Sequence, residues 1–141
     1  MHDFSKCEVI SRTPSAVTYV LDTEPDILVS VPAAGTKDTV HSARDHAGVY
    51  YGYATATGKP CGLVVIMNNL LSQEPEARRI YQNIDKTKIF AAALVVESPL
   101  ARALGSFFVG LTRPVAPTRL FSNMDGAIEW LKAVRPAAAE D

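Results

Sequence analysis

The fold is decided by the run Cys61-Gly62-Leu63-Val64-Val65-Ile66-Met67, which contains no polar side chain apart from a thiol. A second run of the same kind extends from Ile89 to Val96. Short, unbroken apolar runs that are rich in β-branched residues are typical of central strands covered on both faces. The two runs therefore predict two buried strands at the centre of a sheet.

Working outward, the first third of the chain is predicted to form strands. The segments Glu8–Thr13, Ala16–Asp22 and Asp26–Val31 alternate apolar with polar residues, and Pro-containing turns separate them. Alternation with a period of two indicates strands with one packed face. We expect an antiparallel hairpin or meander at this end of the sheet.

Helices are predicted between and after the buried strands. Their spans are Val40–Thr57, Pro75–Ile84, Pro99–Leu111 and a last helix capped by Ser122, with a short strand at Thr118–Phe121 before it. In the first helix, apolar residues recur every three or four positions, which is typical of an amphipathic helix. Strands that alternate with helices after an initial hairpin predict an α/β fold with a mixed, helix-covered sheet.

Length and composition limit the classes of function. The chain has 141 residues, 48% of them hydrophobic and 21% charged, with a formal net charge of −1. We expect one domain over residues 1–135 and a flexible tail at 136–141. A charge so near zero argues against broad electrostatic binding to nucleic acid. The chain lacks an apolar stretch of transmembrane length and an apolar leader, so we expect no integral membrane segment and a cytoplasmic location.

Several segments of the second half resemble a known family. They are Ala91–Ser98, Arg102–Phe108, Pro117–Phe121 and Ala127–Leu131. In order and spacing they resemble small bacterial STAS-like proteins, which are related to sporulation anti-sigma-factor antagonists and remotely to CRAL-TRIO lipid-transfer domains. The resemblance covers roughly residues 26–134. It implies a STAS-like mixed sheet of four to five strands with helices mainly on one face, often a dimer, and no established enzymatic activity.

Function is predicted chiefly from this resemblance. It implies a non-catalytic regulatory domain that binds another protein, so far unidentified, in bacterial regulation. The alternative is a small carrier or sensor of an apolar, lipid-like ligand or of an anionic ligand. An enzyme ranks third, because we find no pair of nucleophile and base, no metal-ligand set and no cofactor loop.

One loop departs from the pattern of the family. The antagonist proteins carry an Asp-Ser-x-Gly phosphoacceptor motif between the first buried strand and the next helix, whereas here the segment Met67–Pro75 has neither an Asp-Ser pair nor a glycine. Ser72 is the only hydroxyl in it, which makes Ser72 the candidate phosphoacceptor. The alternative, which we favour, is that Ser72 caps the following helix.

Residues with reactive side chains form no recognisable site in the sequence. Cys7 and Cys61 are far apart and predict reduced core residues. His41 and His46 lie about 140° apart around the predicted helix, so they cannot share a metal ion. His46 follows Asp45, but neighbours on a helix point in different directions, and we expect His46 on the solvated polar face. We therefore predict no cofactor and no metal.

The helix Pro99–Leu111 is apolar around most of its circumference, and this feature motivates a contact surface. The candidate residues are Arg102, Leu104, Phe107, Phe108 and Leu111. Exposed apolar patches usually mark a surface for a partner or ligand. We rank three uses of such a surface: a homodimer seam first, a groove for an apolar ligand second, and contact with a membrane last. Burial of this helix within one subunit is the alternative.

Two arginines suggest a possible anion contact. Arg78 and Arg102 are expected near the carboxyl ends of the central strands, where ligands usually bind in open α/β sheets. Plain solvated charge is the interpretation that we favour for both.

Overall fold

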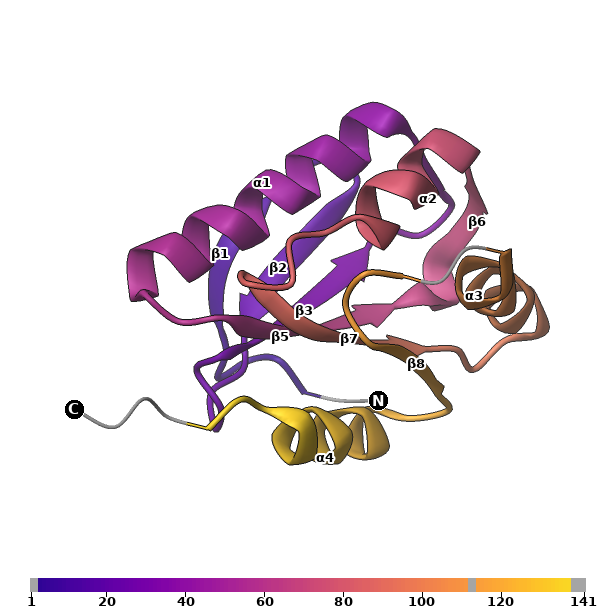
Figure 1. Cartoon of the computed structure of the whole chain (residues 1–141). Helices are drawn as coiled ribbons and strands as arrows, with labels where there is room; N and C mark the ends of the chain where they lie inside the picture. Colours follow the sequence, from indigo (N-terminus) through magenta and orange to yellow (C-terminus); the bar gives the residue numbers. More distant parts are fainter. Residues whose placement is uncertain (1–2, 112–113, 138–141) are drawn as a thin grey trace.

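A six-stranded sheet separates three helices from a fourth (Figure 1). In the computed structural model, residues 3–111 and 114–137 are described. The elements are β1 (Glu8–Arg12), β2 (Ala16–Val20), β3 (Ile27–Pro32), β4 (Thr36–Asp38), α1 (Val40–Thr57), β5 (Cys61–Ile66), the 3-10 turn η1 (Met67–Asn69), β6 (Leu70–Gln73), α2 (Pro75–Gln82), β7 (Ile89–Val95), α3 (Pro99–Leu111), β8 (Thr118–Phe121) and α4 (Met124–Val134). Residues 138–141 of the predicted tail lie outside the described ranges.

The main sheet is mixed, as the residue pattern predicted. Its order is β1-β2-β3-β5-β7-β8, with antiparallel pairing among β1, β2 and β3 and parallel pairing from β3 to β8. The two apolar runs, β5 and β7, are adjacent central strands. Six strands exceed the four to five that the family resemblance implied, because the sheet keeps both β1 and β8 as edge strands.

A second, two-stranded sheet was not predicted. In it, β4 pairs in parallel with β6, and the register places Asp38 opposite Gln73. Each of these short strands leads directly into a helix, β4 into α1 and β6 into α2. The pairing therefore ties the starts of α1 and α2 together and brings two polar side chains side by side.

Local caps set the helix boundaries. Thr39 caps α1 and forms a reciprocal capping box with Ser42, and Gly58 ends the helix with a left-handed φ of 69°. The start of α4 differs from the prediction, because Asn123 rather than Ser122 accepts the hydrogen bond of the cap, from the amide of Gly126. Glu74 occupies the cap position of α2.

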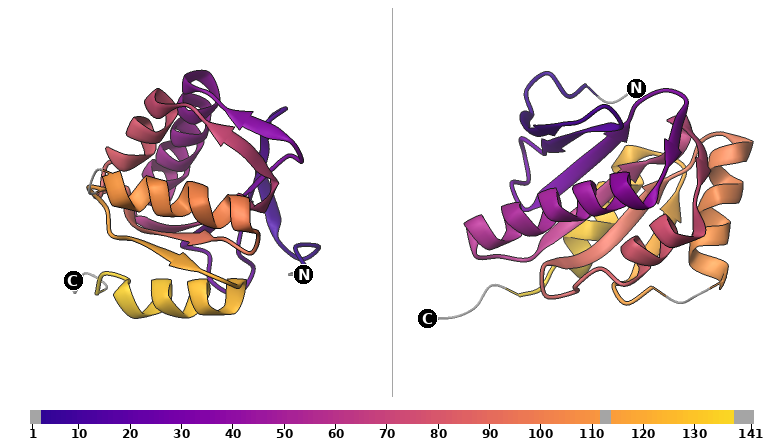
Figure 2. Two further views of the ribbon diagram at one scale, coloured as in Figure 1. Left: turned by 90° about the vertical axis from the view of Figure 1, so that its right-hand side faces the viewer. Right: turned by 90° about the horizontal axis from the view of Figure 1, so that it is seen from above.

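Each face of the main sheet carries its own part of the core (Figure 2). On one face, Val64 and Ala93 pack with Ala127 and Leu131 of α4. On the other face, α1, α2 and α3 cover the sheet, as expected for helices mainly on one side. The packing under α4 is close, because a Cβ atom at Gly62 would lie 2.9 Å from Phe90 Cζ.

Both cysteines are buried and free, which confirms the prediction of reduced core residues. Cys7 belongs to the core on the α4 side, and Cys61 belongs to the core under α1. Burial raises the pKa of the Cys61 thiol to about 11. A thiol with so high a pKa is a poor nucleophile at neutral pH.

Candidate functional site

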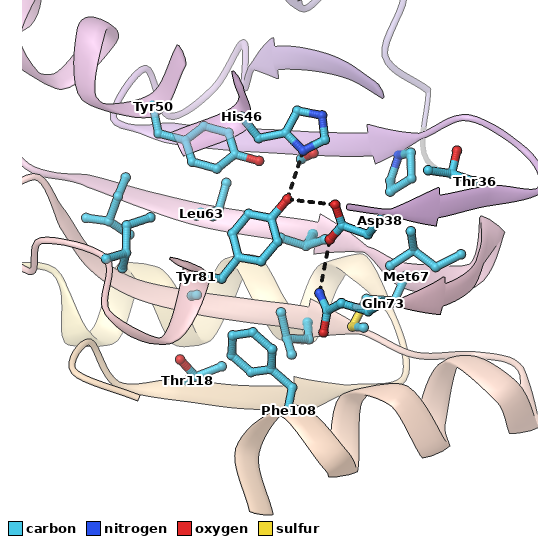
Figure 3. A pocket seen from close by; sticks show the side chains of 18 residues that line it. Thr36, Asp38, His46, Tyr50, Leu63, Met67, Gln73, Tyr81, Phe108 and Thr118 are labelled. Atoms are coloured by element: carbon cyan, nitrogen blue, oxygen red, sulfur yellow. Dashed lines mark hydrogen bonds between the residues drawn. The ribbon is translucent and has the colours of Figure 1, made fainter. Parts of the chain in front are cut away.

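A cavity lies on the face of the sheet that α1, α2 and α3 cover (Figure 3). Its volume is about 50 Å³. Strands β3, β5, β7 and β8 supply its floor, and the three helices with the β4–β6 pair supply its walls. The lining residues are mostly apolar: Pro32, Leu63, Val65, Met67, Leu70, Ile84, Ile89, Ala92, Leu94 and Phe108, with Ser30, Thr36, Asp38, His46, Tyr50, Gln73, Tyr81 and Thr118 as the polar ones.

The polar side chains at one side of the cavity form a hydrogen-bonded group centred on Asp38. Asp38 Oδ1 accepts from Ser42 Oγ at 2.6 Å and from Tyr81 Oη at 3.2 Å. Asp38 Oδ2 accepts from Gln73 Nε2 at 3.1 Å. His46 extends the group, with Nδ1 at 2.9 Å from Tyr81 Oη. We call Asp38, Ser42, His46, Gln73 and Tyr81 the polar cluster.

The direction of each hydrogen bond follows from Asp38. Because a carboxylate only accepts, Tyr81 donates its proton to Asp38 and its oxygen accepts from His46 Nδ1–H. His46 Nε2 is then an acceptor for the hydroxyl of Ser15, at 2.9 Å. Burial lowers the pKa of His46, although Asp38 and Asp45 act against this. His46 is therefore a neutral imidazole at pH 7.

The pair of Ser15 and His46 has the spacing of a nucleophile and its base. Ser15 is in the turn before β2, and it is not among the described residues that line the cavity. Burial raises the pKa of Tyr81, so Tyr81 stays protonated and donates to Asp38 rather than exchanging a proton. The arrangement is suited to holding side chains in place beside a cavity.

The expectation for His46 was wrong. Its side chain is buried and bridges Ser15 and Tyr81, instead of lying on a solvated face of α1. The buried residues of α1 include Ala43, His46 and Tyr50, which follow one another at spacings of three and four. A histidine within this apolar spacing was the signal that could have identified it. His41 is exposed.

The predicted contact surface on α3 is largely turned inward where it is described. Phe108 is 5% exposed and lines the cavity, so it is not an exposed contact residue. Leu104 is half-buried and packs in the same core group as Leu120. The side chains of Phe107 and Leu111 lie outside the described part of the structure. Phe108 is therefore satisfied within one subunit, whereas Leu100 of the same helix is 45% exposed.

The two predicted arginines and Ser72 stand apart from the cavity. Arg102 is exposed, and its Nη2 donates to the carbonyl of Val96 at 3.4 Å. Arg78 is half-buried on α2. Neither lines the cavity. Ser72 is exposed in the middle of β6, so its predicted role as a helix cap is wrong.

The family described as "Domain of unknown function (DUF7793)" matches residues 26–135. The chain belongs to this family. None of the curated proteins matches the DUF7793 chain. Among solved structures, it is similar to an uncharacterised protein of the DUF3478 family with a SpoIIAA-like fold, from Shewanella loihica PV-4. The TM-score is 0.51, the identity is 12%, and the match covers 89% of this chain and 91% of the other.

The structural match confirms the STAS-like fold, because the SpoIIAA-like fold is the fold of the antagonist proteins. At 12% identity, it carries the fold and nothing about ligands or partners. Within residues 3–111 and 114–137, no helix of this DUF7793 domain has both the length and the apolarity to cross a membrane.

Proposed function

We propose that this STAS-like domain is a non-catalytic, cytoplasmic regulatory module of bacteria that binds a small molecule in the cavity between the sheet and α1, α2 and α3. The cavity beside the polar cluster is the observation that carries this proposal. Ligand sites are typically concave, mostly apolar, and supplied with a few well-placed polar groups. The site matches this description, with a floor of strand residues and Asp38, Gln73 and Tyr81 held at one side.

A role in binding rather than catalysis fits the position of the reactive pair. Ser15 is separated from the cavity by His46, which lines it. A ligand in the cavity therefore contacts Asp38 and Tyr81, and the Tyr81 hydroxyl already donates to Asp38. Such a site orients a ligand and offers no free nucleophile.

The test fills the cavity. Ala92 lines it from β7, and Ala92→Leu adds three heavy atoms, enough to occupy most of about 50 Å³. Ethanol is a suitable small, uncharged probe, titrated into isotope-labelled protein and followed by amide NMR shifts. We expect saturable shifts at the lining residues of the wild type and their loss in Ala92→Leu.

Ala103→Leu is the matched control, because Ala103 is exposed on α3. This variant should bind the probe as the wild type does. An absence of saturable shifts in the wild type, or equal binding by Ala92→Leu, contradicts the proposal.

Binding to another protein is the second candidate, and exposed leucines favour it. Leu71 of β6 is 52% exposed and Leu100 of α3 is 45% exposed, on two elements that contact each other. This surface would serve a regulatory protein or a second copy in a homodimer. Sedimentation of the wild type and of Leu100→Asp tests the homodimer. A dimer that dissociates in the variant supports it, and a wild-type monomer at micromolar concentration discards it.

A further inference from the structure

Asp38 is a buried carboxylate without a cationic partner. The residue is 4% exposed, and within the described ranges no lysine, arginine or charged histidine forms an ion pair with it. Buried carboxylates are normally paired with a cation or bound to a metal ion. Among the described residues that line the cavity with Asp38, none is a lysine or an arginine. A positive charge is therefore the group that this site lacks.

The hydrogen-bonding groups around Asp38 also favour a ligand that donates hydrogen bonds. Asp38 Oδ2 accepts from Gln73 Nε2, and the amide oxygen of Gln73 points away from Asp38 (Figure 3). The hydroxyl of Tyr81 already donates to Asp38, and that of Thr118 donates to the carbonyl of Ala116. A carboxylate offers about four acceptor positions. Acceptors thus remain at Asp38 and Gln73, while these hydroxyl donors are occupied.

The apolar lining and the volume of the cavity determine the chemistry and the size of the rest of the ligand. Leu63, Val65 and Met67 line the floor, and the rings of Tyr81 and Phe108 stand beside them. Aromatic faces attract cations, and aliphatic walls favour an alkyl group. The volume of about 50 Å³ is well below the roughly 150 Å³ of an engineered cavity that binds benzene. The space accepts a body of only a few carbon atoms.

We propose that the cavity binds a short alkylammonium ion, with its nitrogen on Asp38 and the Gln73 amide oxygen and its alkyl group against the floor of the sheet. This assignment rests on the ligand-binding function proposed above and names the class of ligand. An anion is unfavourable in this position, because the carboxylate of Asp38 would repel it. The anionic ligand considered from the sequence therefore does not belong in this cavity.

The test compares three probes of nearly equal size and different charge: ethylammonium chloride, ethanol and sodium acetate. Each is titrated at pH 7 and constant ionic strength into labelled wild-type protein, and amide shifts of the lining residues are followed. Amines are protonated at this pH. We expect the ammonium ion to bind about tenfold or more tighter than the alcohol, because its hydrogen bonds are charge-assisted, and acetate to give no saturation.

Two variants assign the charge to Asp38. Asp38→Asn should lose about tenfold in affinity for ethylammonium and keep its affinity for ethanol. The matched control is Asp45→Asn, which removes an exposed carboxylate from the nearby helix α1 and should behave as the wild type. Gln73→Leu, which removes the amide oxygen, should weaken ammonium binding even where Asp38→Asn does not fold.

The outcomes separate the two proposals. If ethanol binds and ethylammonium binds no better, the ammonium assignment is wrong while the ligand cavity stands. If none of the three probes binds, the proposed function fails. If potassium chloride displaces ethylammonium at equal concentration, the site is one for an inorganic cation, and the alkylammonium assignment is overturned.

Discussion

Replacing Tyr81 by phenylalanine tests whether the polar cluster stabilises the fold. The change removes one oxygen atom, which donates to Asp38 Oδ1 at 3.2 Å and accepts from His46 Nδ1 at 2.9 Å. A hydrogen bond to a charged group contributes about 1.5–3 kcal/mol, and a buried donor without an acceptor costs about 1–3 kcal/mol. Because the two effects share one atom, we expect a combined loss of about 2–4 kcal/mol in the free energy of unfolding.

The measurement is urea denaturation, supported by thermal unfolding. For a chain of this length, about 1 kcal/mol corresponds to about 3 °C in Tm, so Tm should fall by about 6–12 °C. Tyr53→Phe is the control, because the Tyr53 hydroxyl donates at 2.8 Å to the exposed carbonyl of Pro25. It should cost no more than about 1 kcal/mol. Equal losses in the two variants would refute the idea that the cluster carries this stability.

Two further predictions concern α1 and α3. Because burial lowers the pKa of His46, the unfolded chain takes up a proton before the folded one as pH falls below about 7. The free energy of unfolding should therefore fall more steeply toward pH 5 in the wild type than in His46→Gln. The control His41→Gln should show the same slope of unfolding free energy against pH as the wild type. Identical slopes in all three proteins would contradict the prediction. In α3, a Cβ atom at Gly105 would lie 2.9 Å from a methyl group of Leu120, whereas a Cβ atom at Gly110 would have no described side chain within 4 Å. Gly105→Ala should lower the free energy of unfolding by about 1–3 kcal/mol, and Gly110→Ala should raise it by about 0.5–1 kcal/mol. Calorimetry measures both changes, and changes of the same sign would argue against this packing.

The main elements could be predicted from the sequence because local signals and tertiary packing agree. The predicted helix Val40–Thr57 coincides with α1, since Thr39 and Gly58 supply its two caps. The apolar run that begins at Cys61 coincides with β5 to within one residue. In such segments hydrophobic periodicity and turn residues suffice to place the boundaries.

The candidate site could not be predicted, because it depends on pairing between distant segments. Strand β4 has three residues and β6 has four, too few to show a period of two. Their pairing brings Asp38 next to Gln73, which is 35 residues away in sequence. His46 was misjudged because a polar residue on a helix was assigned to solvent, although its spacing from Ala43 and Tyr50 places it on the buried face.

The order of the strands bears on how the chain folds during its synthesis. Along the main sheet, the strands follow one another in the order in which they leave the ribosome, so each new strand can add to an edge that is already formed. The face of the sheet that α4 covers is completed last. Val64 and Ala93 on this face are buried by α4, the last helix to be synthesised (Figure 2). Until residues 124–134 emerge, the nascent sheet exposes this apolar face, and such intermediates are prone to aggregate. A nascent chain stalled before α4 should therefore depend on chaperones more strongly than one stalled after it.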